Sequence, residues 1–389
     1  MNELHIDKTR WKKYRFDEVC QQVNEATKDP QTEGLDHVIG LEHIEPNNLH
    51  ITQWDTLEKE TTFTRKFRKG QVLFGRRRAY QRKVAYAEFD GICSGDILVF
   101  EAIEEVLLPE LLPFLIQSEG FFQKALATSA DSLSPRTKFK DLADYEFLLP
   151  PKAEQKRLAE LLWAADEVVE KEKREREKLD IFRQSKLKDI FKSANTHTRL
   201  KDLPLEEING LWKTDDPDSI DVSVIRSTEF SDYGTICFDK LEPMPVKISQ
   251  YKTRKLYPTD IIVERSGGGP DQPVGRVCYF EQNEGEYSFS NFTSCIRVTD
   301  SNVILPKYLF YFLEYYWEMG GTDRIQNQTT GIRNLDYELY KMIKVPMFSI
   351  EEQKQAIGII DQIQLSIFAM KSQIEQSQQI KQELINKIY

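Results

Sequence analysis

The chain carries the same succession of sequence phrases twice, and the two copies lie about half the chain length apart. In the first half, an apolar phrase at residues 70–74 is followed by a Pro-led Glu-Gln-Lys phrase at residues 151–156. In the second half, an apolar phrase at residues 259–263 is followed by Pro346 and by a Glu-Gln-Lys phrase at residues 352–354. A period this long predicts two similar modules in tandem, not a solenoid of short repeats.

The spacing between matching residues increases slowly along the chain. The offset to the second copy is 186 residues at Val38, 189 at Gly70 and 198 at Gln155. Small insertions in surface loops produce such a drift, because loops tolerate added residues well. We therefore expect the modules to share one fold and to differ in their loops.

The 389 residues suffice for two to three domains of ordinary size. No apolar run approaches the roughly 20 residues that would cross a bilayer, and residues 1–15 are charged with no signal-peptide stretch. The five cysteines are widely spaced and include no Cys-x-x-Cys pair, which favours reduced thiols over a zinc ribbon or a disulfide framework. These features predict a cytoplasmic protein that does not associate with membranes.

The charge of the chain is unevenly distributed. A net charge of −10 speaks against nucleic acid as a ligand, since DNA binding usually leaves a basic footprint. Residues 61–87, however, contain no Asp or Glu and nine Lys or Arg residues. An acidic protein with one basic segment is compatible with contact to DNA at a few places.

Short apolar runs separated by glycines predict a mixed α/β module at residues 1–150, and the same layout recurs at residues 194–346. The two modules make this an α+β protein. In the first module we expect strands at residues 38–41, 72–74, 83–87 and 96–100 and a helix at residues 110–128. In the second we expect strands at residues 221–225, 260–263, 275–280 and 294–298 and a helix at residues 307–319.

A long amphipathic helix follows each module, at residues 151–193 and 347–389. In the second helix, Ala356 and Ile360 begin two series of residues that recur every seven positions, which is the spacing of a coiled-coil seam. The middle of the first helix is nearly all charged, so we expect a polar seam there. The residues expected at the seam are Leu158, Ala165, Leu179, Ile360, Ile363, Ile367 and Ile374.

Two pairings of the helices satisfy this pattern. The helices of two chains could form a homodimeric coiled coil, or the two helices of one chain could pair with each other. We prefer the second pairing, because both copies are present in one chain. Two copies joined head to tail approach two-fold symmetry only if their helices run in opposite directions, so we expect an antiparallel, pseudo-two-fold arrangement.

The motifs of common nucleotide-dependent and hydrolytic enzymes are missing from the sequence. Residues 267–270 are Gly-rich but lack the Lys of a P-loop. Residues 149–152 come nearest to the tetrapeptide of an amino-methyltransferase, without the required flanking residues. Neither Gly-x-Ser-x-Gly nor His-Glu-x-x-His occurs. We therefore predict no catalytic residue on this chain.

Two groups of residues resemble metal ligands, but neither has the residue types and spacing that a metal site requires. Asp260 and Glu264 resemble the carboxylates of a metal nuclease, but Ser266 stands where the Lys is required. The three histidines between residues 37 and 50 are spaced by six and seven residues, which places no pair on one helix turn. We predict no metal site.

The basic segment interleaves cations with aromatic residues, a combination that suits nucleic acid. Guanidinium groups bind phosphates and also make bidentate contacts to guanine. A solvated basic loop without a ligand is the alternative. The residues expected to contact DNA here are Arg65, Lys66, Arg68, Arg76, Arg77, Arg78, Tyr80, Arg82 and Lys83.

The matching segment of the second module is rich in Gly and Pro instead of basic residues. Glycine permits positive φ and close approach to a surface, and Ser, Gln and Arg side chains offer donors of the kind that read bases. A plain tight turn fits the sequence equally well. The candidate residues are Arg265, Ser266, Gln272 and Arg276.

The doubled order of phrases resembles that of the specificity subunits of type I restriction–modification systems. The resemblance rests on residues 69–76, 151–156, 258–267 and 346–354 and on the helices that follow them, and it covers essentially the whole chain. It implies target-recognition domain 1 at residues 1–150, a central helix at 151–193, target-recognition domain 2 at 194–346 and a C-terminal helix at 347–389.

In that family, each target-recognition domain reads one half of a split, asymmetric DNA target. The paired helices fix the distance between the halves and dock two methyltransferase subunits, and restriction subunits complete the complex. The resemblance implies no cofactor on this chain, with S-adenosylmethionine on the methyltransferase subunit. Because the two loops differ sharply in sequence, the two half-sites are expected to differ.

Two other interpretations remain open on the sequence. The chain could be a coiled-coil scaffold whose two globular heads bind protein. It could also be the recognition subunit of a related modification system that is not of type I.

Overall fold

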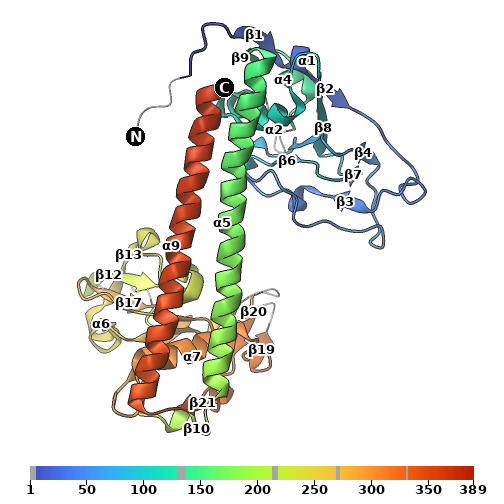
Figure 1. Ribbon diagram of the computed structural model, residues 1–389. Helices are drawn as coiled ribbons and strands as arrows, with labels where there is room; N and C mark the ends of the chain where they lie inside the picture. Colours follow the sequence, from blue (N-terminus) through green and yellow to red (C-terminus); the bar gives the residue numbers. More distant parts are fainter. Residues whose placement is uncertain (1–5, 129–135, 213–217, 269–271, 330–331) are drawn as a thin grey trace. The chain divides into compact units, whose positions relative to one another are not determined.

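The computed structural model describes residues 6–128, 136–212, 218–268, 272–329 and 332–389 (Figure 1). These residues divide into two units. Unit 1 comprises residues 1–174 and 372–389, and unit 2 comprises residues 175–371. Each unit therefore contains one mixed module together with a part of each long helix.

In the part of unit 1 that the structure describes, the strands form two sheets and one separate pair. They are β1 (Lys12–Arg15), β2 (Cys20–Val23), β3 (His37–Ile39), β4 (Arg65–Phe67), β5 (Val72–Gly75), β6 (Val84–Tyr86), β7 (Gly91–Cys93), β8 (Ile97–Ala102) and β9 (Glu146–Leu149). The central sheet has the order β2-β8-β5-β6, and the second sheet has the order β3-β7-β4, with β3 parallel to β7. Strands β1 and β9 pair immediately before the long helix.

Apolar runs explain why β5 and β8 occupy the middle of the central sheet. All four residues of β5 are buried, as are five of the six residues of β8, which suits continuous apolar strands. The Phe100 ring packs against Phe16 and Phe74 at centroid distances of 5.5 and 5.9 Å. The short helices of this unit are α1 (Phe16–Val19), α2 (Leu112–Gln117), α3 (Glu119–Ala127) and α4 (Phe139–Leu142), with 3-10 turns η1 (Leu41–His43), η2 (Ala79–Gln81) and η3 (Pro109–Leu111).

The helix expected at residues 110–128 is interrupted at Ser118. Helix α2 ends there, and the Ser118 hydroxyl accepts a hydrogen bond from Phe121 N at 3.4 Å, which caps α3. The expectation of one continuous helix was therefore wrong. Serine favours N-caps over helix interiors, because its hydroxyl competes for backbone hydrogen bonds.

The described residues of unit 2 form three sheets and one separate strand pair. Its strands are β10 (Thr196–Arg199), β11 (Leu205–Asn209), β12 (Ser219–Ile225), β13 (Pro243–Lys247), β14 (Ile261–Glu264), β15 (Ser266–Gly268), β16 (Val277–Tyr279), β17 (Tyr287–Phe289), β18 (Thr293–Val298), β19 (Gln326–Thr329), β20 (Ile332–Leu335) and β21 (Lys344–Met347). The sheet orders are β11-β18-β14-β16, β13-β12-β17 and β15-β20-β19, and β10 pairs with β21. The short helices are α6 (Ile248–Arg254), α7 (Pro306–Glu318) and α8 (Tyr337–Tyr340), with 3-10 turns η4 (Leu200–Asp202), η5 (Ser227–Glu229), η6 (Asp232–Gly234) and η7 (Phe238–Lys240).

The two units repeat one topology. The sheet β2-β8-β5-β6 corresponds to β11-β18-β14-β16, and the parallel pair β3–β7 corresponds to the parallel pair β12–β17. Each strand expected from the sequence overlaps an observed strand, and the helix expected at residues 307–319 is α7. The expected duplication of an α+β module is confirmed.

A buried glutamine repeats the same hydrogen bonds in both units. In unit 1, Gln155 Nε2 donates to two backbone carbonyls at 2.9 and 3.0 Å, and Oε1 accepts from Leu108 N at 2.8 Å. In unit 2, Gln353 Nε2 donates to two backbone carbonyls at 2.9 and 3.3 Å, and Oε1 accepts from Leu305 N at 2.8 Å. The Glu-Gln-Lys phrase therefore marks a repeated contact that ties the start of each long helix to its module.

The long helices are α5 (Lys152–Lys192) and α9 (Ile350–Ile388), and each contributes to both cores. In unit 1, Leu162 of α5 and Ile385 of α9 belong to the same buried cluster. In unit 2, Leu187 of α5 and Ile360 of α9 do so. No described helix combines the length and the apolar character that spanning a bilayer requires.

Contacts inside unit 1 establish the direction of the helices. Asp166 of α5 binds Lys381 of α9 at 2.8 Å, and Glu172 of α5 binds Gln373 of α9 at 2.7 Å. Residue numbers rise along α5 as they fall along α9, so the two segments are antiparallel (Figure 1). Of the residues expected at the seam, Ala165 and Leu179 are half-buried, and the buried ones are Leu158, Ile360, Ile363, Ile367 and Ile374.

Candidate nucleic-acid interface

The basic segment of unit 1 includes a tight turn that begins where β5 ends. Gly75 closes the strand, and the chain turns through η2 before it enters β6. Arg78 and Arg82, on either side of η2, have φ of 55° and 52°. This left-handed conformation is unfavourable for residues with a Cβ, so the turn carries local strain. At its tip Tyr80 is 59% exposed, and Arg78 is also exposed.

Four of the candidate cations in this segment have partners inside the protein. Lys66 pairs with Glu33 at 2.5 Å, and Arg68 pairs with Glu25 at 3.0 Å. Arg82 pairs with Glu119, and its guanidinium lies 4.9 Å from the centroid of the Phe122 ring. Lys83 Nζ donates to Leu41 O at 2.6 Å. These side chains hold parts of unit 1 together.

Arg77 and Arg136 converge on Asp96, the residue just before β8, and Arg65 binds backbone carbonyls beside it. The Arg65 guanidinium donates to Ile97 O and, at 3.4 Å, to Gly95 O. Arg77 Nη1 lies 3.7 Å from Asp96 Oδ2, and Arg136 Nε lies 2.9 Å from Asp96 Oδ1.

Arg76 lies beside the same group of side chains. Its Nε is buried and has no hydrogen-bond partner among the described residues. Burial and the guanidinium groups of Arg65 and Arg136 lower the pKa of Arg76. Reasoning from the sequence missed Arg136, because it lies outside the basic segment. No local sequence pattern marks Arg136, because it reaches Arg77 only through a backbone bridge between distant parts of the chain.

In unit 2 the four candidate residues occupy different environments. Arg265 Nη1 donates to Asn209 Oδ1 at 2.8 Å, and its guanidinium lies 4.2 Å from the centroid of the Tyr337 ring. Ser266, on β15, donates to Asn334 Oδ1 at 2.5 Å. Exposed Gln272 lines a cavity of about 490 Å³.

Arg276, the fourth candidate, is held by Glu264. Its Nε and Nη2 each donate to a Glu264 carboxylate oxygen at 2.9 Å, and Nη2 also donates to Ser227 O at 3.0 Å. The side chain of Glu264 is 2% exposed. A buried carboxylate whose two oxygens are both bound by one edge of a guanidinium is a structural ion pair. Of the Gly-rich run, residues 269–270 lie outside the described residues.

The resemblance of Asp260 and Glu264 to nuclease carboxylates has a structural explanation. Asp260 accepts from Arg297 Nε and Nη2, both at 2.8 Å, and its side chain is 1% exposed. Glu264 is bound to Arg276 in the same manner. Each carboxylate is held by a half-buried arginine in a structural ion pair, which explains both acids without a metal ion.

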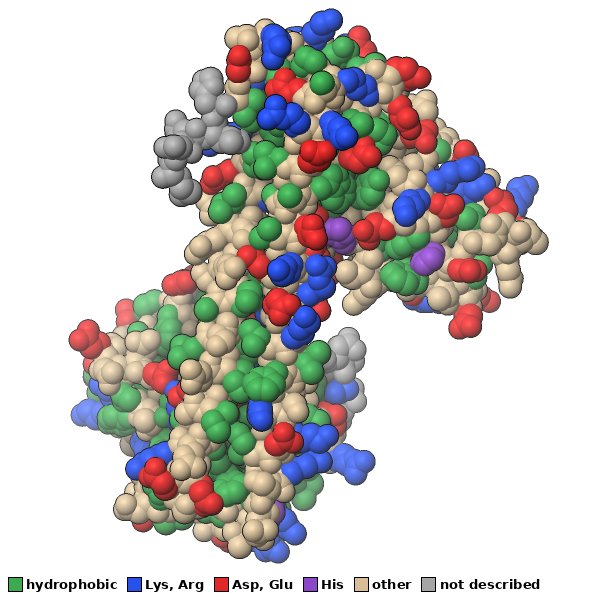
Figure 2. Space-filling view, in the orientation of Figure 1, with side chains coloured by type: hydrophobic (Ala, Val, Ile, Leu, Met, Phe, Trp, Pro, Cys, Tyr) green, Lys and Arg blue, Asp and Glu red, His purple; other side chains and the backbone are tan. Residues whose placement is uncertain are grey.

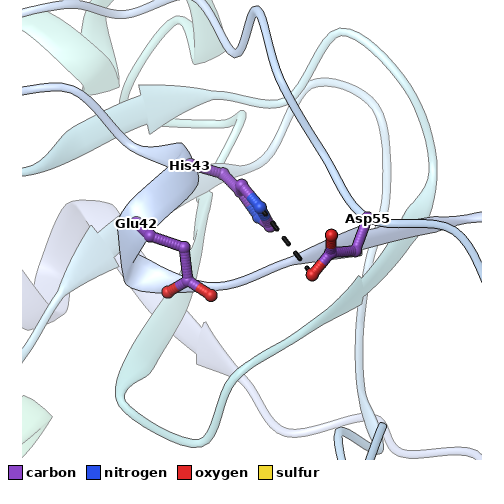
Figure 3. A group of neighbouring side chains, drawn as sticks. All are labelled: Glu42, His43 and Asp55. Carbon is purple, nitrogen blue, oxygen red and sulfur yellow. Dashed lines mark ion pairs between the residues drawn. The ribbon is translucent and has the colours of Figure 1, made fainter. Parts of the chain in front are cut away.

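Figure 3 shows Glu42, His43 and Asp55, whose ligand atoms lie within 4.8 Å of one another. Gly40 N donates to His43 Nδ1 at 2.9 Å, so in the neutral ring Nε2 carries the proton. That Nε2 faces Asp55 Oδ2 at 3.9 Å and has no lone pair for a metal. Asp55 also accepts from Lys59 Nζ at 2.9 Å. The group is better explained as a capped turn than as a metal site.

The other two histidines of this region also have structural environments. His37 stacks on Phe89 with ring centroids 4.1 Å apart. His50 Nε2 lies 2.7 Å from Asp166 Oδ2, and Nδ1 lies 3.2 Å from Glu88 Oε1. His50 therefore connects the module of unit 1 to α5.

Residues 8–180 match a family model described as the type I restriction modification DNA specificity domain. The type I restriction enzyme EcoDI specificity subunit of Escherichia coli is 25% identical over 231 residues, which cover 56% of this chain and 47% of the relative. The chain thus spans about half the length of the curated relative that it matches.

Two solved structures share the fold. A chain from a structure concerned with complex assembly and conformational transition of the type I R-M system gives a TM-score of 0.60 at 18% identity, covering 98% of this chain and 97% of that one. The type I restriction–modification system S subunit from M. genitalium gives a TM-score of 0.56 at 14% identity, covering 99% and 98%. At these identities the likeness concerns the fold alone.

Proposed function

Through residues 8–180 the chain belongs to the family of type I restriction–modification specificity subunits, and from this premise we propose that it is the DNA sequence-recognition subunit of a type I complex. The module at residues 1–150 reads one half of a bipartite target, and the module at residues 194–346 reads the other. The target is asymmetric, because the loops of the two modules carry different side chains.

One observation carries this proposal: the units repeat a scaffold while the residues that follow equivalent strands differ. β5 of unit 1 leads to Arg76 and Arg77, whereas β14 of unit 2 leads to Arg265 and Ser266. A repeated scaffold with different side chains at one edge suits the recognition of two different base sequences by one chain. A protein-binding scaffold gives no reason for the excess of arginines at that edge of unit 1.

The chemistry of the system belongs to partner subunits. The carboxylates and histidines considered as candidate ligands form ion pairs, caps or ring stacks among the described residues. We therefore assign no methyl transfer and no DNA cleavage to this chain, and no cofactor. S-adenosylmethionine is expected on the methyltransferase subunit.

The long helices serve two roles in this proposal: they dock two methyltransferase subunits, and they set the spacer between half-sites. Large apolar side chains remain exposed along both helices, including Val168 at 48%, Ile181 at 67% and Leu365 at 68%. Figure 2 shows hydrophobic side chains at the surface over the helices. Exposed apolar patches commonly mark protein-binding surfaces. Restriction subunits complete the complex, which acts on DNA in the cytoplasm.

The experiment purifies the full chain with its native partner subunits and selects duplexes from a random-sequence library. We expect two short blocks of constant sequence separated by a spacer of fixed length. Binding should weaken as salt rises, with a log–log slope of about −0.9 for each phosphate contacted.

The alternative functions give different results in the same experiment. A scaffold with protein-binding heads would enrich no duplex. A recognition subunit of a different modification system would enrich a motif, but it would co-purify with subunits other than a type I methyltransferase.

A further inference from the structure

The backbone hydrogen bonds align the two units residue by residue at the strand end. In unit 1, Arg76 N donates to Asp96 O at 3.0 Å, and Thr137 N donates to Arg76 O at 3.0 Å. In unit 2, Arg265 N donates to Phe292 O at 2.8 Å, and Leu335 N donates to Arg265 O at 2.8 Å. The neighbouring bridge pairs Arg77 with Arg136 in unit 1 and Ser266 with Asn334 in unit 2.

Three positions are therefore equivalent in backbone and different in side chain. The strand-end set of unit 1 is Arg77, Asp96 and Arg136. The strand-end set of unit 2 is Ser266, Phe292 and Asn334. The residue that makes the equivalent backbone hydrogen bonds is an arginine in both units: Arg76 in unit 1 and Arg265 in unit 2.

The strand-end set of unit 1 presents two guanidinium groups held by one carboxylate. The side chains of Arg77 and Arg136 are 41% and 53% exposed, while that of Asp96 is 20% exposed. Arg136 contacts both carboxylate oxygens, with Nε at 2.9 Å from Oδ1 and Nη2 at 3.4 Å from Oδ2. The carboxylate thus binds one edge of the Arg136 guanidinium and fixes its orientation, while about half of that side chain stays exposed. An oriented arginine fork matches the O6 and N7 acceptors of guanine.

The strand-end set of unit 2 carries no charge. Ser266 donates to Asn334 at 2.5 Å, and Phe292 is 50% exposed. Asparagine amides match the N6 and N7 edge of adenine, and an exposed phenyl ring can contact the methyl group of thymine.

We propose that these two strand-end sets determine base specificity, that of unit 1 selecting guanine and that of unit 2 selecting an A·T pair. This inference rests on the proposed function and names the residues that carry it out. Contact to phosphate alone does not explain both sets. Neutral Ser and Asn side chains form no ion pair with phosphate, and the Asp96 carboxylate cancels one of the two positive charges of the other set.

The experiment uses the full chain in complex with the partner subunits that co-purify with it. Duplexes are selected from a random library, and the motif is read by sequencing. Affinities are then measured by fluorescence anisotropy on the selected duplex and on its single-base variants. Arg136→Ala is expected to reduce the preference for guanine at one position of one half-site by roughly 5- to 150-fold. Asn334→Ala is expected to relax one position of the other half-site by a similar factor.

Arg15→Ala is the matched control. Arg15 is 51% exposed in its side chain, pairs with Asp17 at 2.5 Å and lies in the same unit. Arg15→Ala removes one paired cation whose exposure is close to that of Arg136, and it should leave the selected DNA motif unchanged. Thermal unfolding of each variant verifies that the unit remains folded.

Asp96→Asn tests the positioning role of the carboxylate. Removing this charge should leave overall DNA affinity equal or higher, while guanine discrimination falls because the forks lose their orientation. A merely structural role for Asp96 would instead lower affinity and thermal stability together, without a change in base preference.

Two outcomes overturn the inference while the proposed function stands. Arg136→Ala with an unchanged motif would show that the set does not read bases. An equal loss of affinity on every duplex, with a salt slope smaller by about 0.9, would show contact to phosphate only. If the native complex enriches no motif, the proposed function fails and the inference fails with it.

Discussion

Lys381 of α9 donates to Asp166 of α5 at 2.8 Å inside unit 1, and both side chains are almost completely buried. Asp166 also binds His50, at 2.7 Å from Nε2. One carboxylate therefore joins the end of the chain, the central helix and the module of unit 1. The heptad pattern places Lys381 in an apolar seam, and Asp166 is the physical reason that a lysine is tolerated there.

Lys381→Ala should destabilise unit 1 by about 3–5 kcal/mol, because it leaves a buried carboxylate without its principal cation. Urea unfolding followed by intrinsic fluorescence measures the effect. Lys387→Ala, an exposed lysine on the same helix, serves as the control and should change stability by less than about 0.5 kcal/mol. The double variant Asp166→Asn, Lys381→Met should recover most of the loss, and a double variant as unstable as Lys381→Ala would contradict this account.

The stabilisation contributed by His50 should depend on pH. The hydrogen bond to Asp166 outweighs burial and raises the pKa of His50. Stability from a raised pKa is fully present below the unfolded value of about 6.5 and is lost as pH rises through the folded value. For Asp166, burial alone would raise the pKa, but the bonds from His50 and Lys381 lower it. That contribution is fully present above the unfolded value of about 3.9 and is lost as pH falls through the lower folded value.

The stability contributed by the raised pKa of His50 and that contributed by the lowered pKa of Asp166 are therefore both present between about pH 4 and 6.5. The difference in melting temperature between the native protein and His50→Gln should be largest near pH 6 and should shrink toward pH 8.5. Subtracting the variant removes the titration of other groups. A difference that stays constant or grows with rising pH would show that His50 is not the titrating group.

Gln353→Ala should destabilise unit 2 by about 1–3 kcal/mol, since it leaves the buried amide of Leu305 without an acceptor. Gln155→Ala should have a comparable effect on unit 1, where Leu108 N loses the same partner. Gln362→Ala, an exposed glutamine on α9, is the matched control. Equal melting temperatures for Gln353→Ala and Gln362→Ala would mean that the repeated contact has no energetic role.

Two substitutions of Arg78 distinguish an effect on DNA binding from an effect on stability, because the backbone φ of 55° at this position favours glycine. Arg78→Gly and Arg78→Ala both remove the cation, and each should reduce the salt slope of DNA binding by about 0.9 if Arg78 contacts a phosphate. Arg78→Gly should be more stable than Arg78→Ala by about 1 kcal/mol, since glycine avoids the left-handed strain. Arg15→Ala, which removes an exposed cation outside the basic segment, is the control and should leave the salt slope unchanged. Native DNA binding by both Arg78 variants would identify the turn as a solvated loop.

A four-residue insertion in both helices should lengthen the spacer and leave the half-sites alone. One added turn is about 5.4 Å, which lies between one and two base pairs of rise. The insertions are placed after Arg174 in α5 and after Lys371 in α9, so that the antiparallel seam is extended on both sides. Sequencing of bases modified by the assembled complex gives the motif. An active variant with the original spacer would show that the helices do not set the distance.

The sequence by itself determined the duplicated module, the principal strands and the two long helices. These features depend on local periodicity: period two for strands, 3.6 for helices and seven for the seam. The helix expected at residues 110–128 was the exception. Ser118 caps a new helix instead of continuing the preceding one, and the apolar pattern is the same in both cases.

Only the tertiary structure decided which cations are available at the candidate interface. Lys83 and Arg82 belong to the same basic run as Arg77, yet they bind Leu41 and Glu119 inside the unit. Arg136 lies far along the chain from Arg77 and meets it at Asp96. Such partners are set by sheet register and loop closure, which join residues tens to hundreds of positions apart and leave no local pattern in the sequence.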